Sequence, residues 1–90
     1  MKFLVKATVN VDTMLEFGKK LQNNELDRSY IRGETYCTKD NPAVGYSIWE
    51  ADSREEFEEK FAQWKQFYLY TETYEVISPG EAMKLLMADM

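Results

Sequence analysis

The chain contains no histidine, and only one cysteine, two prolines and four glycines among its 90 residues. Without histidine, one chain cannot form a Ser-His-Asp or Cys-His triad, a histidine zinc site or a histidine-ligated haem site. Its only cysteine, Cys37, has no partner for an internal disulfide, as expected in a reducing compartment. The glycines form neither a Walker-type phosphate loop nor a GxGxxG motif. We therefore expect no metal site and no cofactor of these kinds.

Positive charge is also scarce, with 11 basic against 16 acidic residues and a net charge of −5. Nucleic-acid binding depends on Lys and Arg that neutralise phosphates, so no nucleic-acid partner is expected. No apolar run approaches the ~20 residues of a membrane span, and the start MKFLVKATV lacks the apolar region of a signal peptide. We expect a cytoplasmic protein without a membrane partner.

The composition is that of a folded protein, since 44% of the residues are hydrophobic and 30% are charged. The length predicts a single domain, residues 1–90. A chain this short buries only about 60 to 65% of the surface that its unfolded form exposes. An exposed apolar face would therefore be costly, and self-association would remove it.

Four segments show the composition or alternation of β-strands. Hydrophobic residues alternate from Lys2 to Asn10, the pattern of a half-buried strand. Tyr30 to Cys37 and Ala43 to Glu50 flank the turn-rich segment 38–42, which predicts a hairpin. Leu69 to Ile77 is rich in Tyr, Thr and Val and predicts a fourth strand.

Three capping-box patterns predict helix starts at Thr13, Ser53 and Ser78, each with Glu three residues later. The last of them has Pro at the first helical position and predicts a helix from Pro79 to about Ala88. Helical periodicity predicts an inward stripe on each of the two longer helices. The first stripe contains Met14, Phe17, Gly18 and Leu21, and the second contains Phe57, Phe61, Trp64 and Tyr68. A glycine within such a stripe suggests close packing against the sheet.

The order of elements is βαββαβ with a C-terminal helix, which predicts a ferredoxin-like α+β fold with a four-stranded antiparallel sheet. Right-handed crossovers place both long helices on one face of the sheet. The other face is left uncovered by helices. It carries Leu4 and one of the two alternating sets of side chains from the third strand. These sets are Val44, Tyr46 and Ile48 or Gly45, Ser47 and Trp49. We expect a second copy of the chain to cover this face, because symmetric dimers prevail among oligomers.

Several segments resemble small uncharacterised proteins of the dimeric α/β barrel superfamily, over nearly the whole chain. They are the opening MKFLV, the run GYSIWEAD from Gly45, the pair Trp64-x-x-Phe67, and EVISP from Glu75 followed by Glu81-Ala82. The loop between the first helix and the second strand lies outside the resemblance. The resemblance implies the dimeric barrel fold, often with a ligand pocket between the sheet and its helices in each protomer.

Aromatic and charged residues of the strands and second helix are the candidate ligand-binding set. They are Arg32, Glu34, Tyr36, Tyr46, Trp49, Trp64, Glu72 and Tyr74. Aromatic walls with a few polar groups suit a planar organic molecule. Core packing and dimer contact explain the same residues without a ligand, so both interpretations stay open.

Two other features favour structural roles. The glutamates at positions 55, 56, 58 and 59 point in different directions around a helix, which predicts a solvated surface and no metal site. Cys37 ends a strand without an obvious base beside it, and free cysteine is usually a small buried apolar residue.

Three functional hypotheses remain. The first is a homodimeric module that binds a small apolar or aromatic molecule or another protein. The second is a cofactor-free enzyme resembling monooxygenases or muconolactone-type isomerases of the barrel superfamily, with Glu34 or Glu72 as a base of burial-raised pKa. The third is that the Met-rich ending docks on another protein, although packing over its own domain or its dimer mate is favoured. That ending contains Met83, Leu85, Leu86, Met87 and Met90.

Overall fold

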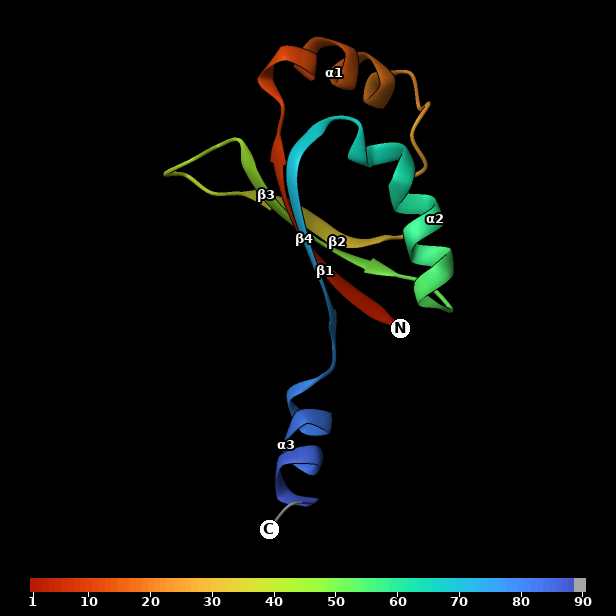
Figure 1. Ribbon diagram of the computed structural model, residues 1–90, viewed down its shortest axis with the longest axis vertical. Helices are drawn as coiled ribbons and strands as arrows, with labels where there is room; N and C mark the ends of the chain where they lie inside the picture. Colours follow the sequence, from red (N-terminus) through yellow and green to blue (C-terminus); the bar gives the residue numbers. More distant parts are fainter. Residues whose placement is uncertain (89–90) are drawn as a thin grey trace.

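The computed structural model describes residues 1–88 and contains four strands, a short 3₁₀ turn and three α-helices (Figure 1). In chain order these are β1 (Lys2–Val9), η1 (Val11–Thr13), α1 (Met14–Gln22), β2 (Ile31–Cys37), β3 (Val44–Glu50), α2 (Arg54–Lys65), β4 (Tyr68–Val76) and α3 (Pro79–Ala88). The strands form one antiparallel sheet in the order β2-β3-β1-β4. The predicted ferredoxin-like order with a terminal helix is confirmed. Among residues 1–88, no helix is both long enough and apolar enough to span a bilayer.

The core lies between the sheet and α2. Alternation along β1 places Phe3 and Val5 on the covered face, where both are almost fully buried. Trp49 shares this face, so Gly45 and Ser47 point towards the helices, whereas the set containing Val44, Tyr46 and Ile48 faces away. Because β1 and β3 pair in register, Phe3 lies directly opposite Trp49. These strands therefore present their largest apolar side chains at the same place.

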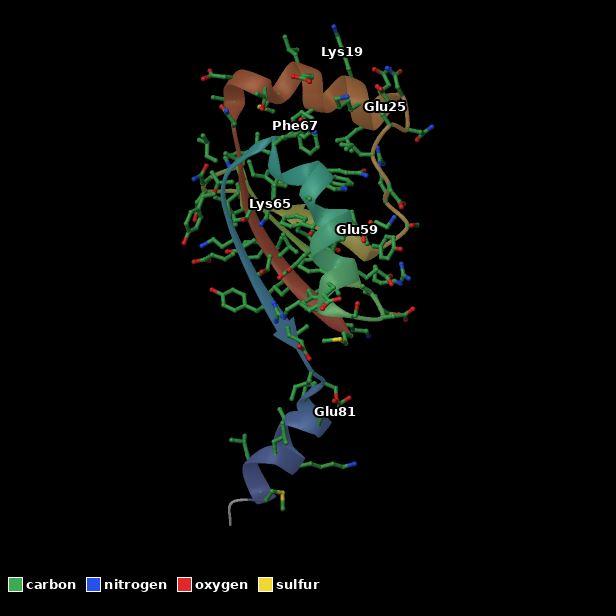
Figure 2. The ribbon with its side chains drawn as sticks, turned by 45° about the vertical axis from the view of Figure 1, so that its right-hand side comes forward. Lys19, Glu25, Glu59, Lys65, Phe67 and Glu81 are labelled. Atoms are coloured by element: carbon green, nitrogen blue, oxygen red, sulfur yellow. The ribbon has the colours of Figure 1, made fainter. Side chains whose placement is uncertain are left out.

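Helix α2 begins and packs largely as predicted. The Ser53 hydroxyl accepts a hydrogen bond of 3.1 Å from the Glu56 backbone amide, which confirms the cap. The inward side chains of Phe57, Phe61 and Trp64 are buried, while Glu59 lies on the exposed outer surface (Figure 2). Tyr68 was expected on the same helical stripe, but the helix ends at Lys65 and Tyr68 is the first residue of β4.

Helix α1 lies across one end of the sheet and does not lie flat on it (Figure 1). Only Phe17 and Leu21 pack against the core cluster, whereas Met14 is 53% exposed. The expected close packing of Gly18 is wrong, since a Cβ built there would meet nothing within 4 Å. The predicted cap at Thr13 is also wrong, because its hydroxyl donates to the Asn10 carbonyl at 3.0 Å and caps no amide.

Helix α3 starts at the predicted cap, where the Ser78 hydroxyl accepts a hydrogen bond of 3.1 Å from the Glu81 amide. The helix projects away from the sheet, as Figure 1 and the position of Glu81 in Figure 2 show. Its large apolar side chains are between 62% and 72% exposed; these are Met83, Leu85, Leu86 and Met87. Of the two expected arrangements, packing over its own domain is therefore wrong, and packing over a dimer mate stays a prediction. Met90, the last residue of the predicted Met-rich ending, lies outside the described residues.

Candidate functional site

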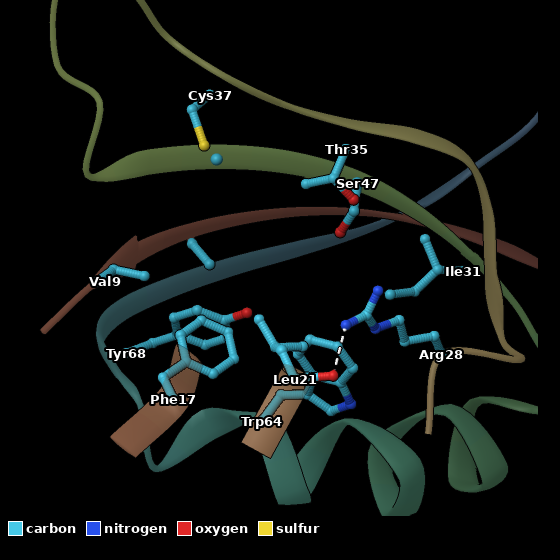
Figure 3. A pocket seen from close by; sticks show the side chains of 12 residues that line it. Val9, Phe17, Leu21, Arg28, Ile31, Thr35, Cys37, Ser47, Trp64 and Tyr68 are labelled. Atoms are coloured by element: carbon cyan, nitrogen blue, oxygen red, sulfur yellow. Dashed lines mark hydrogen bonds between the residues drawn. The ribbon is translucent and has the colours of Figure 1, made fainter. Parts of the chain in front are cut away.

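A cavity of about 310 Å³ lies between the sheet and the two helices α1 and α2 (Figure 3). Its floor comes from β1 and β3, and one side from β2. The opposite wall is formed by Phe17 and Leu21 of α1, Trp64 of α2 and Tyr68 of β4. The remaining lining residues are Ala7, Val9, Arg28, Ile31, Thr35, Cys37, Gly45 and Ser47. The lining is mostly apolar, with a small number of polar groups, as is usual for small-molecule sites.

The cavity follows from a decrease in side-chain size along two paired strands. On the covered face, the register pairs Phe3 with Trp49, then residue 5 with residue 47, then Ala7 with Gly45. The pairs therefore change from Phe and Trp to Val and Ser, and finally to Ala and Gly. Because α1 lies across the end of the sheet, it does not fill the space that these small residues leave.

Aromatic contacts hold α1 above this space. The Phe17 ring stacks on Phe67 with 4.8 Å between the ring centroids. It also meets the edge of Trp64 at 6.0 Å and of Tyr68 at 5.8 Å. Figure 2 shows Phe67 directly beneath α1. This cluster sets the position of the helix above the sheet and gives the cavity an aromatic, apolar wall.

The segment between α1 and β2 brings Arg28 to the cavity mouth. The chain reverses after α1 at Asn24, whose φ of 56° lies in the left-handed region that Asn tolerates. The Arg28 side chain is exposed, and its Nη2 donates a hydrogen bond of 2.9 Å to the Leu21 carbonyl (Figure 3). This bond ties the guanidinium to the last turn of α1, beside the cavity.

Two hydroxyl groups add polarity inside the cavity. The Ser47 Oγ accepts a hydrogen bond of 3.0 Å from the indole Nε1 of Trp49. The Tyr68 hydroxyl points into the cavity (Figure 3), and burial together with the nearby Cys37 raises the pKa of Tyr68 to about 12. At neutral pH the Tyr68 side chain is therefore an uncharged hydrogen-bond donor and acceptor.

Trp64 contributes an unsatisfied donor. Its side chain lines the cavity and the residue is only 5% exposed. Within the part of the chain that the structure describes, the buried Trp64 Nε1 has no hydrogen-bond partner. An unpaired buried donor costs about 1 to 3 kcal/mol, so this nitrogen is a local cost to the stability of the fold.

Trp64 is the one predicted ligand-binding residue that lines the cavity. Trp49 is buried next to it in the core, at 1% exposure. The other predicted residues lie on the opposite, open face of the sheet: Arg32, Glu34, Tyr36, Tyr46, Glu72 and Tyr74. The predicted set is thus divided between the two faces and does not form one site.

On the open face the polar groups of this set pair with neighbours. The Tyr36 hydroxyl donates to Glu34 at 2.8 Å, and the Tyr70 hydroxyl donates to Glu72 at 2.9 Å. The Lys6 ammonium lies 3.8 Å from Glu72. The carboxylate next to each phenol raises the pKa of that phenol.

The cavity contains residues that the sequence reasoning did not select, above all Arg28, Ser47 and Tyr68. The decrease in side-chain size from Phe3 to Val5 to Ala7 in the first strand could have indicated the cavity. The matching decrease in β3 can be recognised only when the pairing of the two strands is known. Cys37 was expected to be buried, yet it is exposed and lines the cavity. Among residues 1–88, no group of three or more His, Cys, Asp or Glu is placed to hold a metal ion.

No protein-family model matches the sequence, and no curated protein does. Solved structures do resemble it. A 5-chloro-2-hydroxyhydroquinone dehydrochlorinase from Burkholderia phenoliruptrix AC1100, in complex with 2,5-dihydroxybenzoquinone, has a TM-score of 0.56 at 14% identity over 90% of this chain and 98% of that chain. An antibiotic biosynthesis monooxygenase has a TM-score of 0.49 at 10% identity, over 86% of this chain and 98% of that one. A putative antibiotic biosynthesis monooxygenase from Nitrosomonas europaea has a TM-score of 0.47 at 13% identity, over 86% of this chain and 98% of that chain.

The likeness to the dehydrochlorinase extends over 90% of this chain and agrees with the fold described above. At 14% identity, the likeness to the dehydrochlorinase shows the fold alone. What the site of this chain binds has to be argued from its own residues.

Proposed function

We propose that this protein is a homodimeric binding module, a single domain of residues 1–90, that holds a small, largely apolar or aromatic molecule in the cavity beneath α1. The observation that carries the proposal is the cavity of about 310 Å³ in a chain of only 90 residues. Small-molecule sites typically measure about 300 to 1,000 Å³. The proposal includes no cofactor and no nucleic-acid partner, and the expected location is the cytoplasm.

The walls favour a flat ring as the ligand. Phe17, Trp64 and Tyr68 present aromatic surfaces to a space whose floor is made of Ala7 and Gly45. Aromatic pairs gain about 0.5 to 1.5 kcal/mol beyond the area that they bury, so a ring gains more here than an aliphatic chain of similar size. The dehydrochlorinase neighbour is described with 2,5-dihydroxybenzoquinone, which suggests oxygenated rings as first probes.

A cofactor-free enzyme is the alternative, and the position of the carboxylates gives it less support. Glu34 and Glu72 were its candidate bases, and both lie on the open face of the sheet, away from the cavity. The ionisable groups that line the cavity are Arg28, Cys37 and Tyr68. A proton-transfer mechanism would have to use these groups, whereas ligand binding needs none of them to change protonation.

The open face of the sheet is the proposed dimer interface. On this face Tyr36 is 65% exposed, Tyr70 55% and Tyr74 52%. Leu4 and Ile48 lie between these tyrosines. Tyrosine is enriched at protein interfaces because its ring is apolar and its hydroxyl finds a partner. Two ion pairs already lie on this face, Lys6 with Glu72 and Arg32 with Glu50, which lowers the cost of burying these four charges.

Helix α3 is proposed to contact the same partner copy. A single helix of ten residues is not stable alone in water, and this one exposes four large apolar side chains. At the base of α3, Ile48, Val76 and Ile77 line a second hollow that continues from the open face. A partner that covers the open face would therefore also reach α3, so one contact would bury both apolar surfaces.

Cys37 provides a direct test of binding, because it lines the cavity and is the only cysteine in the chain. We expect 2-naphthol to slow the reaction of the wild-type thiol with a thiol reagent in a saturable, concentration-dependent way. Ala7→Leu fills the floor of the cavity and should abolish this protection. Reaction rates that do not change with any aromatic probe, in a folded wild-type protein, would refute the binding proposal.

The dimer is tested by sedimentation or light scattering. The wild type should have twice the chain mass of 10.6 kDa. Tyr74→Glu places an additional charge on the open face and should yield monomers, and deletion of residues 79–90 should weaken association. Glu59→Lys on the outer surface of α2 is the matched control and should remain dimeric. A folded wild-type particle of 10.6 kDa would refute self-association.

A further inference from the structure

Within the described residues, the cavity lining carries a single charged side chain, and its charge is positive. Arg28 is the only lining side chain that is charged at neutral pH among residues 1–88, and no Asp or Glu lines the cavity. The whole chain, in contrast, carries a net charge of −5. The cavity mouth is therefore a local positive site on an acidic protein, which repels cations and attracts anions.

Arg28 is held in place without being neutralised. Its Nη2 donates to the Leu21 carbonyl at 2.9 Å, a bond that uses one of the five N–H donors. No carboxylate of residues 1–88 forms an ion pair with the guanidinium. The neighbouring Asp27 instead accepts hydrogen bonds from the Ser29 amide at 2.8 Å and the Ser29 hydroxyl at 2.6 Å. Figure 3 shows the Arg28 guanidinium directed from its loop into the cavity.

The other polar groups of the cavity also offer donors. The Ser47 oxygen already accepts from Trp49, so its own hydroxyl hydrogen is free to bind a ligand oxygen. The Tyr68 hydroxyl points inwards and is protonated at neutral pH. A ligand that matches these groups must supply acceptors.

We propose that the ligand of this cavity is an aromatic acid, whose ring lies between Phe17, Trp64 and the small-residue floor and whose carboxylate binds the Arg28 guanidinium. The inference deepens the proposed binding function and rests on it. A carboxylate matches the planar fork of Arg in two parallel hydrogen bonds, whereas a neutral amide of the same shape offers one acceptor and no charge. A cationic ligand is disfavoured by the same residue.

The test compares matched acid and amide pairs, benzoate with benzamide and 2-naphthoate with 2-naphthamide. Binding is measured by isothermal titration and by protection of the Cys37 thiol. For the wild type we expect 2-naphthoate to bind at least about tenfold more tightly than 2-naphthamide, because charge-assisted hydrogen bonds are about twice as strong as neutral ones. The preference should also weaken as salt concentration rises, since Arg28 lies at the exposed mouth.

Three variants identify the residue responsible. Arg28→Gln should remove the preference for the acid, and Arg28→Lys should restore part of it, because Lys keeps the charge and loses the fork. Arg54→Gln removes an equal charge from α2 at a position outside the cavity lining and should behave as the wild type. The thermal unfolding midpoint of each variant shows whether the fold is preserved.

The outcomes separate the two proposals. Equal binding of acid and amide by the wild type, or an unchanged preference in a folded Arg28→Gln variant, would overturn the assignment to an anion while the binding function stands. Failure of both pairs to bind or to protect Cys37 would overturn the aromatic-acid inference. If 2-naphthol then still protects the thiol, the binding proposal survives this result; if it does not, both proposals fall.

Discussion

The two ends of one sheet face contrast in packing. At one end Phe3 stacks on Phe57 at 4.3 Å between ring centroids, and Trp49 meets the ring of Phe61 at 5.3 Å. At the other end the same two strands present Ala7 and Gly45 to a cavity. Strand geometry is the same at both ends, so the difference lies in side-chain volume and in the helix above.

The helices reinforce this contrast. α2 presses Phe57 and Phe61 onto the packed end, whereas α1 contributes only Phe17 and Leu21 to the wall of the hollow end. Close packing is the ordinary state of a protein interior, and small domains have little stability to spare for voids. A hollow of this size in so short a chain is therefore the feature on which the proposed ligand site rests.

The largest expected effect comes from the packed end. Phe57→Ala removes a ring that is 1% exposed, and we expect it to lower the free energy of unfolding by about 3 to 5 kcal/mol. Phe17→Ala at the hollow end removes a half-buried ring and should cost roughly 1 to 2 kcal/mol. Urea unfolding monitored by circular dichroism measures both values. Equal losses would show that the two ends are packed alike.

The elements of the packed end could be predicted from the sequence. The strands, the cap at Ser53 and the buried residues Phe57 and Phe61 all follow from local periodicity and capping chemistry. The order βαββαβ then leaves few topologies, and the observed ferredoxin-like order is among them. These features depend on interactions between residues that are near in sequence.

The hollow end could not be predicted because it depends on distant residues. The helical pattern placed Met14 and Gly18 on an inward face, but α1 meets too little of the sheet to bury either. The decrease in residue size towards the cavity arises because Ala7 pairs with Gly45. This pairing is set by the sheet register, which joins residues far apart in the sequence. Arg28 lies in a loop without periodicity. The candidate set instead followed aromatic content, and most of it lies on the open face.

An intermediate effect is expected from the hydroxyl of Tyr68 in the hollow end. Its pKa in the folded protein is raised to about 12, whereas an unfolded Tyr titrates near 10. The folded state thus keeps the proton more tightly, and the resulting stability is complete below pH ~10 and is lost as pH rises towards 12. The loss is on the order of 2 kcal/mol.

Tyr68→Phe should therefore lose less stability between pH 9 and pH 12 than the wild type, as measured by urea unfolding at each pH. Tyr74→Phe, on the exposed open face, is the control for general alkaline destabilisation. Absorbance at 295 nm reports the phenolate directly. If Tyr68 titrated near pH 10, the hollow end would be well hydrated and its polarity would differ little from that of the surface.

The smallest expected effect comes from a matched pair of substitutions that add the same volume to the two ends. Ala7→Leu places a larger side chain into the cavity, where it buries apolar area without displacing neighbours, so stability should change by less than about 1 kcal/mol in either direction. Ala51→Leu, at a residue only 6% exposed in the packed core, should cost about 1 to 3 kcal/mol through overpacking. The two midpoints of urea unfolding, compared with that of the wild type, measure the difference. A loss for Ala7→Leu as large as that for Ala51→Leu would mean that the hollow end closes in solution, and that the space beneath α1 is not free to take a ligand.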